Sequence, residues 1–207
     1  MKKNPFDNLT SEYEAWFVEN KTLFQSELLA LRQVVPVDKK GLEIGVGSGI
    51  FAEQLGIHYG IDPAEKMLEY ARARGVEVQK GVAERLPYED ESFDYAALIT
   101  TICFVDDPQG AIQEAYRILK KKGEIIIAML DKATPFGQFL DKGKDKSRFY
   151  KYASFFSAVE IVELLETNSF RVVHVLQTLE NPATTIVENP AEGHGKGSFV
   201  VIKGVKE

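Results

Sequence analysis

The stretch Glu43-Ile44-Gly45-Val46-Gly47-Ser48-Gly49 decides the fold. It joins a short apolar run at residues 41–44 to a helical pattern at residues 50–55. Glycines at such a strand-to-helix junction let the backbone turn tightly and let a ligand approach the main-chain amides. A tight turn that binds nothing is the alternative, because one glycine cluster does not by itself specify a site.

The chain around this turn alternates between strand-like and helical patterns. Strand-like runs occur at residues 41–44, 57–61, 76–79, 93–102, 125–127, 170–175 and 198–202, and helical patterns at residues 50–55, 64–74, 108–119 and 157–167. Strands that alternate with helices build a parallel sheet covered by helices on both faces. The last two runs have no helix between them, so they can pair antiparallel at one edge. We therefore predict an α/β fold with a doubly wound, seven-stranded, Rossmann-like sheet, mostly parallel with an antiparallel edge strand.

The 207 residues are predicted to form a single domain, residues 1–207, because no repeat or linker divides them. Apolar side chains recur at helical spacing until Pro36, which predicts an N-terminal helical cap over residues 1–36. Residues 131–152 are polar and aromatic with a lysine-rich centre. We expect this segment to form a surface excursion near the substrate side.

Composition and charge exclude several classes of protein. The 44% hydrophobic and 27% charged residues are typical of a globular chain. A net charge of -6 argues against nucleic acid as the main partner. Export signals and membrane-length apolar runs are missing from the sequence, so we expect a cytoplasmic protein with no membrane partner. The single cysteine, Cys103, and three scattered histidines predict neither an internal disulfide nor a metal site.

The glycine spacing discriminates between nucleotide cofactors. A dinucleotide site has the spacing G-x-G-x-x-G, whereas this turn has G-x-G-x-G with Ile50 in the place of the third glycine. Glu43 would also repel a pyrophosphate, so a cationic ligand without phosphate fits better, such as S-adenosylmethionine with its ammonium and sulfonium groups. Asp62 ends the next strand-like run. Its carboxylate can accept hydrogen bonds from two ribose hydroxyls. Because Pro63 follows it, Asp62 can also be the N-cap of the next helix, and the two roles are compatible.

Three further segments carry a family resemblance. Gly-Val-Ala-Glu-Arg-Leu-Pro-Tyr at residues 81–88, followed by Ser-Phe-Asp at 92–94, is similar to a G-D-A-E-x-L-P-F…S-F-D signature. Residues 114–123 resemble E-x-x-R-V-L-K-P-G-G, and residues 155–165 resemble F-S-x-x-E-L-x-x-L-L. With the glycine turn, these matches in order from about residue 41 to 177 resemble the class I S-adenosylmethionine-dependent methyltransferases. The resemblance is to their small-molecule branch, which includes the ubiquinone/menaquinone-biosynthesis (type 11) enzymes.

The resemblance implies S-adenosylmethionine as the cofactor. Gly45 and Gly47 would line its methionine and ribose portion, Asp62 would hold the ribose, and Ala83 would donate its backbone N–H to the adenine. At Val82 the family usually has an aspartate that accepts from the adenine amino group, so that contact is lost or moves to Glu84 or a backbone carbonyl. The full set of implied cofactor-binding residues is Glu43 (ordering the amino group), Gly45, Gly47, Gly49, Asp62, Pro63, Ala83 and Glu84.

The reaction implied is methyl transfer to a small-molecule acceptor by in-line displacement, in which the protein aligns the reactants and excludes water. A catalytic base is required only if the acceptor must lose a proton. The candidates for the acceptor side are Thr100, Thr101, Phe104, Tyr13, Trp16 and Tyr150. Oxygen, nitrogen and carbon acceptors all stay open, as does the oligomeric state. The alternatives are a Rossmann-type NAD(P)-dependent oxidoreductase and a non-catalytic nucleoside-binding module.

Overall fold

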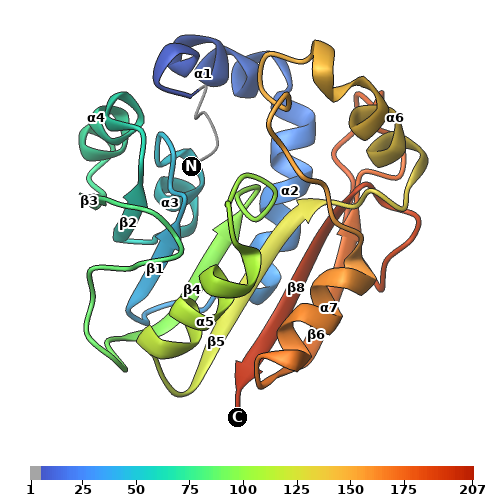
Figure 1. Ribbon diagram of the computed structural model, residues 1–207. Helices are drawn as coiled ribbons and strands as arrows, with labels where there is room; N and C mark the ends of the chain where they lie inside the picture. Colours follow the sequence, from blue (N-terminus) through green and yellow to red (C-terminus); the bar gives the residue numbers. More distant parts are fainter. Residues whose placement is uncertain (1–5) are drawn as a thin grey trace.

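The computed structural model describes residues 6–207, and an eight-stranded sheet runs through its centre (Figure 1). The strand order is β3-β2-β1-β4-β5-β8-β6-β7. β1 to β5 pair in parallel, and β8 is antiparallel to both β5 and β6. The strands are β1 Gly41–Ile44, β2 Tyr59–Asp62, β3 Glu77–Lys80, β4 Phe93–Ile99, β5 Leu119–Leu130, β6 Phe170–Thr178, β7 Ala191–Glu192 and β8 Phe199–Lys206. The predicted doubly wound, mostly parallel sheet with an antiparallel edge is confirmed.

The predicted number of seven strands is wrong, because β7 adds an eighth. This two-residue strand pairs antiparallel with β6, Leu176 opposite Glu192 and Gln177 opposite Ala191. It lies between Pro190 and Gly193, and two residues are too few to produce an alternating apolar pattern. Only its partner strand holds it in the sheet.

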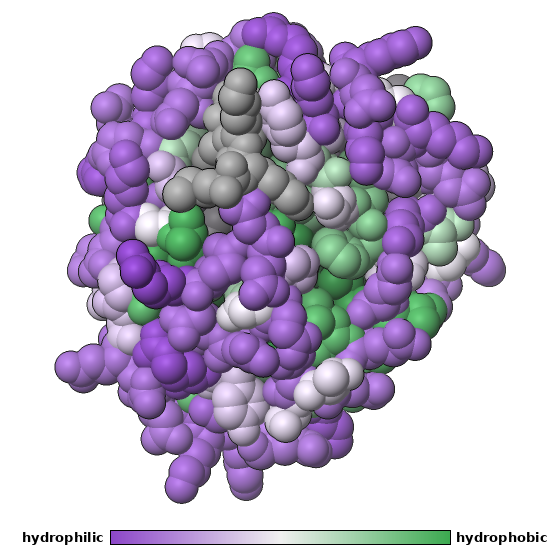
Figure 2. Space-filling model, viewed as in Figure 1, coloured by the Kyte–Doolittle hydropathy of each residue, from purple (hydrophilic) through white to green (hydrophobic). Residues whose placement is uncertain are grey.

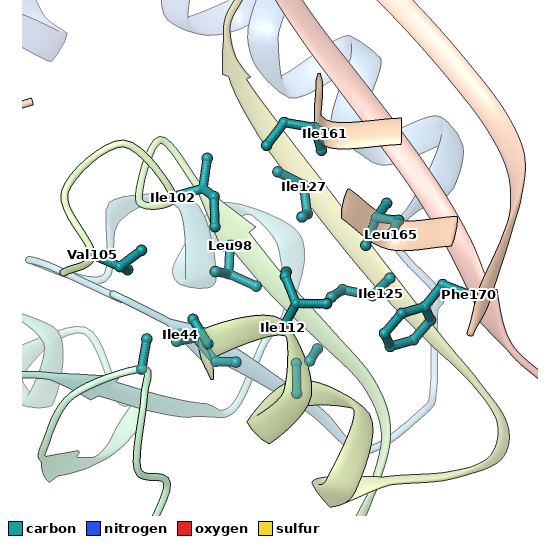
Figure 3. Close-up of a cluster of buried hydrophobic side chains, with 14 of the residues drawn as sticks. Ile44, Leu98, Ile102, Val105, Ile112, Ile125, Ile127, Ile161, Leu165 and Phe170 are labelled. Carbon is teal, nitrogen blue, oxygen red and sulfur yellow. The ribbon is translucent and has the colours of Figure 1, made fainter. Parts of the chain in front are cut away.

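Helices cover both faces of the sheet. α2 Lys21–Val34, α3 Ile50–Leu55 and α4 Glu65–Ala73 pack on one face, and α5 Pro108–Ile118 and α7 Ala158–Thr167 pack on the other. Figure 3 shows the second face, where Ile112 of α5 and Ile161 of α7 lie against Ile44, Leu98 and Ile127 of the central strands. The apolar runs in the sequence are therefore strands buried on both faces, as parallel strands generally are.

Two helices lie over the carboxyl ends of the parallel strands: α1 Thr10–Glu19 and α6 Pro135–Gly143 (Figure 1). The helical pattern before Pro36 is split at Asn20, whose Nδ2 donates to the Trp16 carbonyl at 2.9 Å, so the chain turns sharply between α1 and α2. Short 3-10 turns flank these helices at Phe6–Asn8 and Lys144–Lys146. Within residues 6–207, every helix is too short or too polar to cross a bilayer.

Candidate functional site

The glycine turn after β1 adopts a backbone that requires glycine. Gly45 and Gly47 have φ values of 75° and 52°, in the left-handed region that side chains disfavour. The backbone N–H groups of Gly45 and Val46 donate to the Ile61 carbonyl at 2.8 and 3.0 Å, which fixes the turn to β2. A Cβ on Gly45 would overlap the Thr101 side chain, so the turn also packs closely against the end of β4.

Gly49 has a different role from the other two glycines. It precedes α3 with φ of 77°, and a Cβ at this position would lie 3.0 Å from the Ala71 Cα of α4. Arg74, at the end of α4, adds a link from the same helix: its Nη1 donates to the Ser48 carbonyl at 2.9 Å and bonds Glu14 of α1 at 3.3 Å. Gly49 therefore allows α3 and α4 to pack closely, and Arg74 links α1 to the turn by hydrogen bonds.

Asp62 ends β2 beside this turn. Its Oδ2 accepts from the Gly47 N–H at 3.0 Å, and its Oδ1 accepts from the Ala64 N–H at 2.8 Å. Burial raises the pKa of Asp62 to about 6 although both N–H groups lower it. α4 begins only at Glu65, so Asp62 is not the N-cap of that helix. A carboxylate has about four acceptor positions, so two remain for further donors.

Glu43 is buried behind the turn and is missing from the described lining of the cavity. Its Oε2 has no hydrogen-bond partner within residues 6–207. Burial, followed by the nearby charge of Asp62, raises the pKa of Glu43 well above its ordinary value, and the Ala52 N–H partly offsets this. Burial thus favours the protonated form of this carboxyl group.

A cavity of about 320 Å³ opens at the carboxyl ends of the strands, between the glycine turn, α1, α2 and α6. Twelve of the predicted site residues line it, and Glu43 and Gly49 do not. The twelve are Tyr13, Trp16, Gly45, Gly47, Asp62, Pro63, Ala83, Glu84, Thr100, Thr101, Phe104 and Tyr150. The fold thus brings together residues that are as far apart as 13 and 150 in the sequence.

Aromatic side chains close the top of the cavity. The ring of Phe6 lies 5.1 Å from that of Phe104 and 6.3 Å from that of Phe149, measured between centroids. Phe104 in turn stacks on Tyr150 at 6.2 Å. On the face in Figure 2, hydrophobic side chains gather near the middle of a mostly hydrophilic surface. These contacts join the N-terminal region to residues 149–150 over part of the cavity.

The end of β4 carries backbone strain at the cavity wall. Thr100 has φ of 52°, which is unfavourable for a β-branched residue, and its N–H donates to the Ala128 carbonyl at 2.8 Å. The next residue, Thr101, donates through its hydroxyl to the carbonyls of Ile99 and Gly45 at 3.0 and 3.2 Å. Strained residues of this kind concentrate at functional sites.

Glu27 of α2 is a charged cavity residue that sequence reasoning missed. Its side chain lines the cavity and its residue is only 5% exposed. Burial raises the pKa of Glu27 to about 8. The signal was present in the sequence: Glu27 lies four residues from both Leu23 and Leu31, on the apolar stripe of its helix.

The charged side chains in the described lining of the cavity are all acidic. Its described lining holds four carboxyl groups, those of Glu27, Asp62, Glu84 and Asp106, and no lysine, arginine or histidine. Burial and the charges of Glu43, Asp62 and Glu27 raise the pKa of Tyr13 well above its ordinary value, so the Tyr13 hydroxyl keeps its proton. The site therefore favours cationic ligands over anionic ones.

The glycine turn, the carboxylate at the end of β2 and the chamber over the strand ends agree with the S-adenosylmethionine site expected from the sequence. A family model for the methyltransferase domain matches residues 42–127. The chain belongs to the S-adenosylmethionine-dependent methyltransferases, because a structure described as a member of that class is 46% identical to it over 98% of both chains. S-adenosylmethionine is its methyl donor.

Individual relatives span nearly the whole chain. A crystal structure from Thermotoga maritima, described as a SAM-dependent methyltransferase and possible histamine N-methyltransferase, is 46% identical over 98% of both chains, with a TM-score of 0.94. An uncharacterized protein of Methanocaldococcus jannaschii is 38% identical over 98% of this chain and 99% of its own length. The ubiquinone/menaquinone biosynthesis C-methyltransferase of Rickettsia bellii is 26% identical over 72% of this chain and 64% of its own length.

Proposed function

We propose that this methyltransferase methylates a small-molecule acceptor inside the aromatic chamber over the strand ends. The observation that carries the proposal is the partial aromatic cover over that chamber. The chamber holds about 320 Å³ and is partly covered by α1, α6 and the aromatic contacts of Phe6 with Phe104 and Phe149. An ion pair of 2.9 Å between Arg148 and Glu12 fastens the segment before Phe149 to α1. A macromolecular acceptor would need an open groove at this position.

The turn and Asp62 fit the methyl donor. Gly45 and Gly47 have no side chains to obstruct a close approach, and Asp62 keeps free acceptor positions for the two ribose hydroxyls. The buried Glu43 has an oxygen without a hydrogen-bond partner within residues 6–207, which leaves an acceptor position behind the turn. Pro63, Ala83 and Glu84 extend the same wall toward the adenine end.

The donor supplies a methyl group already activated on a sulfonium sulfur, so the chain's own residues mainly align the reactants and exclude water. Thr100, Thr101 and Phe104 line the cavity next to the turn. We assign Tyr13, Trp16 and Tyr150, whose rings also line the cavity, to the acceptor. Oxygen and ring faces at these positions stabilise positive charge on the reacting groups.

The test needs no assumption about the acceptor. The protein is incubated with a metabolite extract and a donor carrying an isotope-labelled methyl group, and mass spectrometry finds small molecules that gain the label. We expect a labelled product that disappears when the protein is heat-inactivated. If only macromolecules gain label, the small-molecule proposal is wrong. If S-adenosylhomocysteine binds but nothing gains label, the protein is a non-catalytic nucleoside-binding module.

The relative from Thermotoga maritima, described as a possible histamine N-methyltransferase, points to nitrogen acceptors as the first to examine. At 46% identity over nearly the full length, the two chains share the chamber's framework, so an amine is a reasonable first acceptor to test.

A further inference from the structure

The cavity contains one buried carboxyl group for which the methyl donor has no evident use. Of the four lining carboxyl groups, Asp62 accepts from two backbone N–H groups, and Glu84 accepts from the N–H groups of Asp106 and Asp107. Glu27, by contrast, makes no hydrogen bond or ion pair with any other residue in the range 6–207. A buried carboxyl group without a partner is unfavourable unless a ligand supplies one.

Glu27 lines the cavity from the side of α2. It belongs to α2, which descends behind the sheet from α1 (Figure 1). Its charge acts on the hydroxyl groups of both Tyr13 and Tyr150, which places it between the N-terminal cap and the segment after α6. Leu23, one turn earlier on the same helix, and Trp16 line the same part of the wall.

The surroundings of Glu27 are those of a cation site. Ten of the described lining residues are aromatic, and aromatic faces attract organic cations. The described lining has no basic side chain that could neutralise Glu27 or pair with an anionic acceptor. Acceptors that carry a phosphate or a carboxylate near this wall would find no basic partner in the described lining.

We propose that Glu27 selects the acceptor by pairing with a basic nitrogen, so that the natural acceptor is a small amine with an apolar or aromatic body. This inference rests on the proposed function and names the substrate class for that chamber. Glu27 is a specificity-determining residue: its carboxylate holds the protonated nitrogen, and the aromatic wall packs against the rest of the molecule. An acceptor with a hydroxyl group at the same position would leave the carboxylate without a cation.

The test measures binding separately from turnover. The protein is saturated with S-adenosylhomocysteine, and calorimetry measures the affinity of matched amines, alcohols and carboxylates built on phenyl, imidazolyl, indolyl and cyclohexyl ethyl cores. We expect the best amine to bind at least about tenfold more tightly than its alcohol, and the carboxylate not to bind. Glu27→Gln removes this preference and leaves S-adenosylhomocysteine affinity unchanged. Glu19→Gln, at an exposed position in the cap, keeps the preference.

Three outcomes overturn the inference: no amine binds, alcohols bind as tightly as amines, or the preference survives in Glu27→Gln. A labelled product without a basic nitrogen overturns it too, while the proposed methylation of a small molecule stands. If the extract yields no labelled product but Glu27-dependent amine binding is found, the cation site is supported and the proposed function fails.

Discussion

Replacing Glu27 with glutamine should stabilise the protein, and increasingly so as the pH rises. In the folded chain, burial holds the pKa of Glu27 at about 8, against 4.5 for the free side chain. Between these values the folded state binds one more proton than the unfolded state, so rising pH favours unfolding. Each pH unit in that window lowers the free energy of unfolding by about 1.4 kcal/mol. From pH 5 to pH 8 the free energy of unfolding of the wild type should therefore fall by about 3–4 kcal/mol. Glu27→Gln has no proton to lose at this position and should not show this fall.

Urea unfolding without ligand measures this difference. The single tryptophan, Trp16, lies in the cavity wall and reports unfolding by its fluorescence. Free energies of unfolding of wild type, Glu27→Gln and the exposed control Glu19→Gln are compared from pH 5 to pH 8. The control should follow the wild type throughout. If the wild type and Glu27→Gln curves run parallel, Glu27 titrates as an ordinary exposed carboxyl group and the reasoning is refuted.

Three further changes test the site. Asp62→Ala should weaken S-adenosylhomocysteine binding at least about tenfold in calorimetry while the circular dichroism spectrum is kept, because ribose acceptors are lost; unchanged affinity would reject the ribose role. Gly45→Ala should lower the free energy of unfolding by about 2–4 kcal/mol in urea, since the new methyl overlaps Thr101. Gly56 has a similar φ of 68° but open space around it, so Gly56→Ala is the control. An equal loss in the free energy of unfolding there would show that backbone strain, not overlap, is responsible. Arg74→Ala should speed hydrogen exchange in α1, and exchange unchanged from the wild type would mean that Arg74 does not hold the cap.

The central sheet could be predicted because its strands are buried on both faces. The apolar runs at β4 and β5 indicate a parallel core. The capping box of Ser157 and Glu160 starts α7 inside the helical pattern expected over residues 157–167. The elements that the sequence did not reveal, β7 and α6, either lack such signals or lie among residues with conflicting ones. α6 begins with Thr134 as its N-cap and Pro135 in the first turn, which is a usual signal for a helix start. The lysine-rich centre of residues 131–152 instead predicts a surface excursion.

The half of the site that sits at strand ends could be predicted for a topological reason. The carboxyl ends of parallel strands meet at one edge of the sheet, so Gly45, Asp62 and Thr101 had to lie close together. The acceptor half comes from helices and loops whose positions depend on tertiary packing. Glu27 faces the cavity only because α2 turns away from α1 at Asn20, and sequence spacing does not give that angle.

The raised pKa of Glu27 and its proposed pairing with an amine are two aspects of one equilibrium. At pH 7 the carboxyl group holds its proton in the protein alone, whereas the proposed partner binds the ionised form. Binding of a protonated amine must then expel most of one proton from Glu27. The calorimetric binding enthalpy should accordingly depend on the ionisation enthalpy of the buffer at pH 7, and this dependence should fade at pH 9, where Glu27 is already ionised. In Glu27→Gln the dependence should be missing at both pH values. If proton release persists in Glu27→Gln, the proton comes from another group. Amine binding would then not be linked to the ionisation of Glu27.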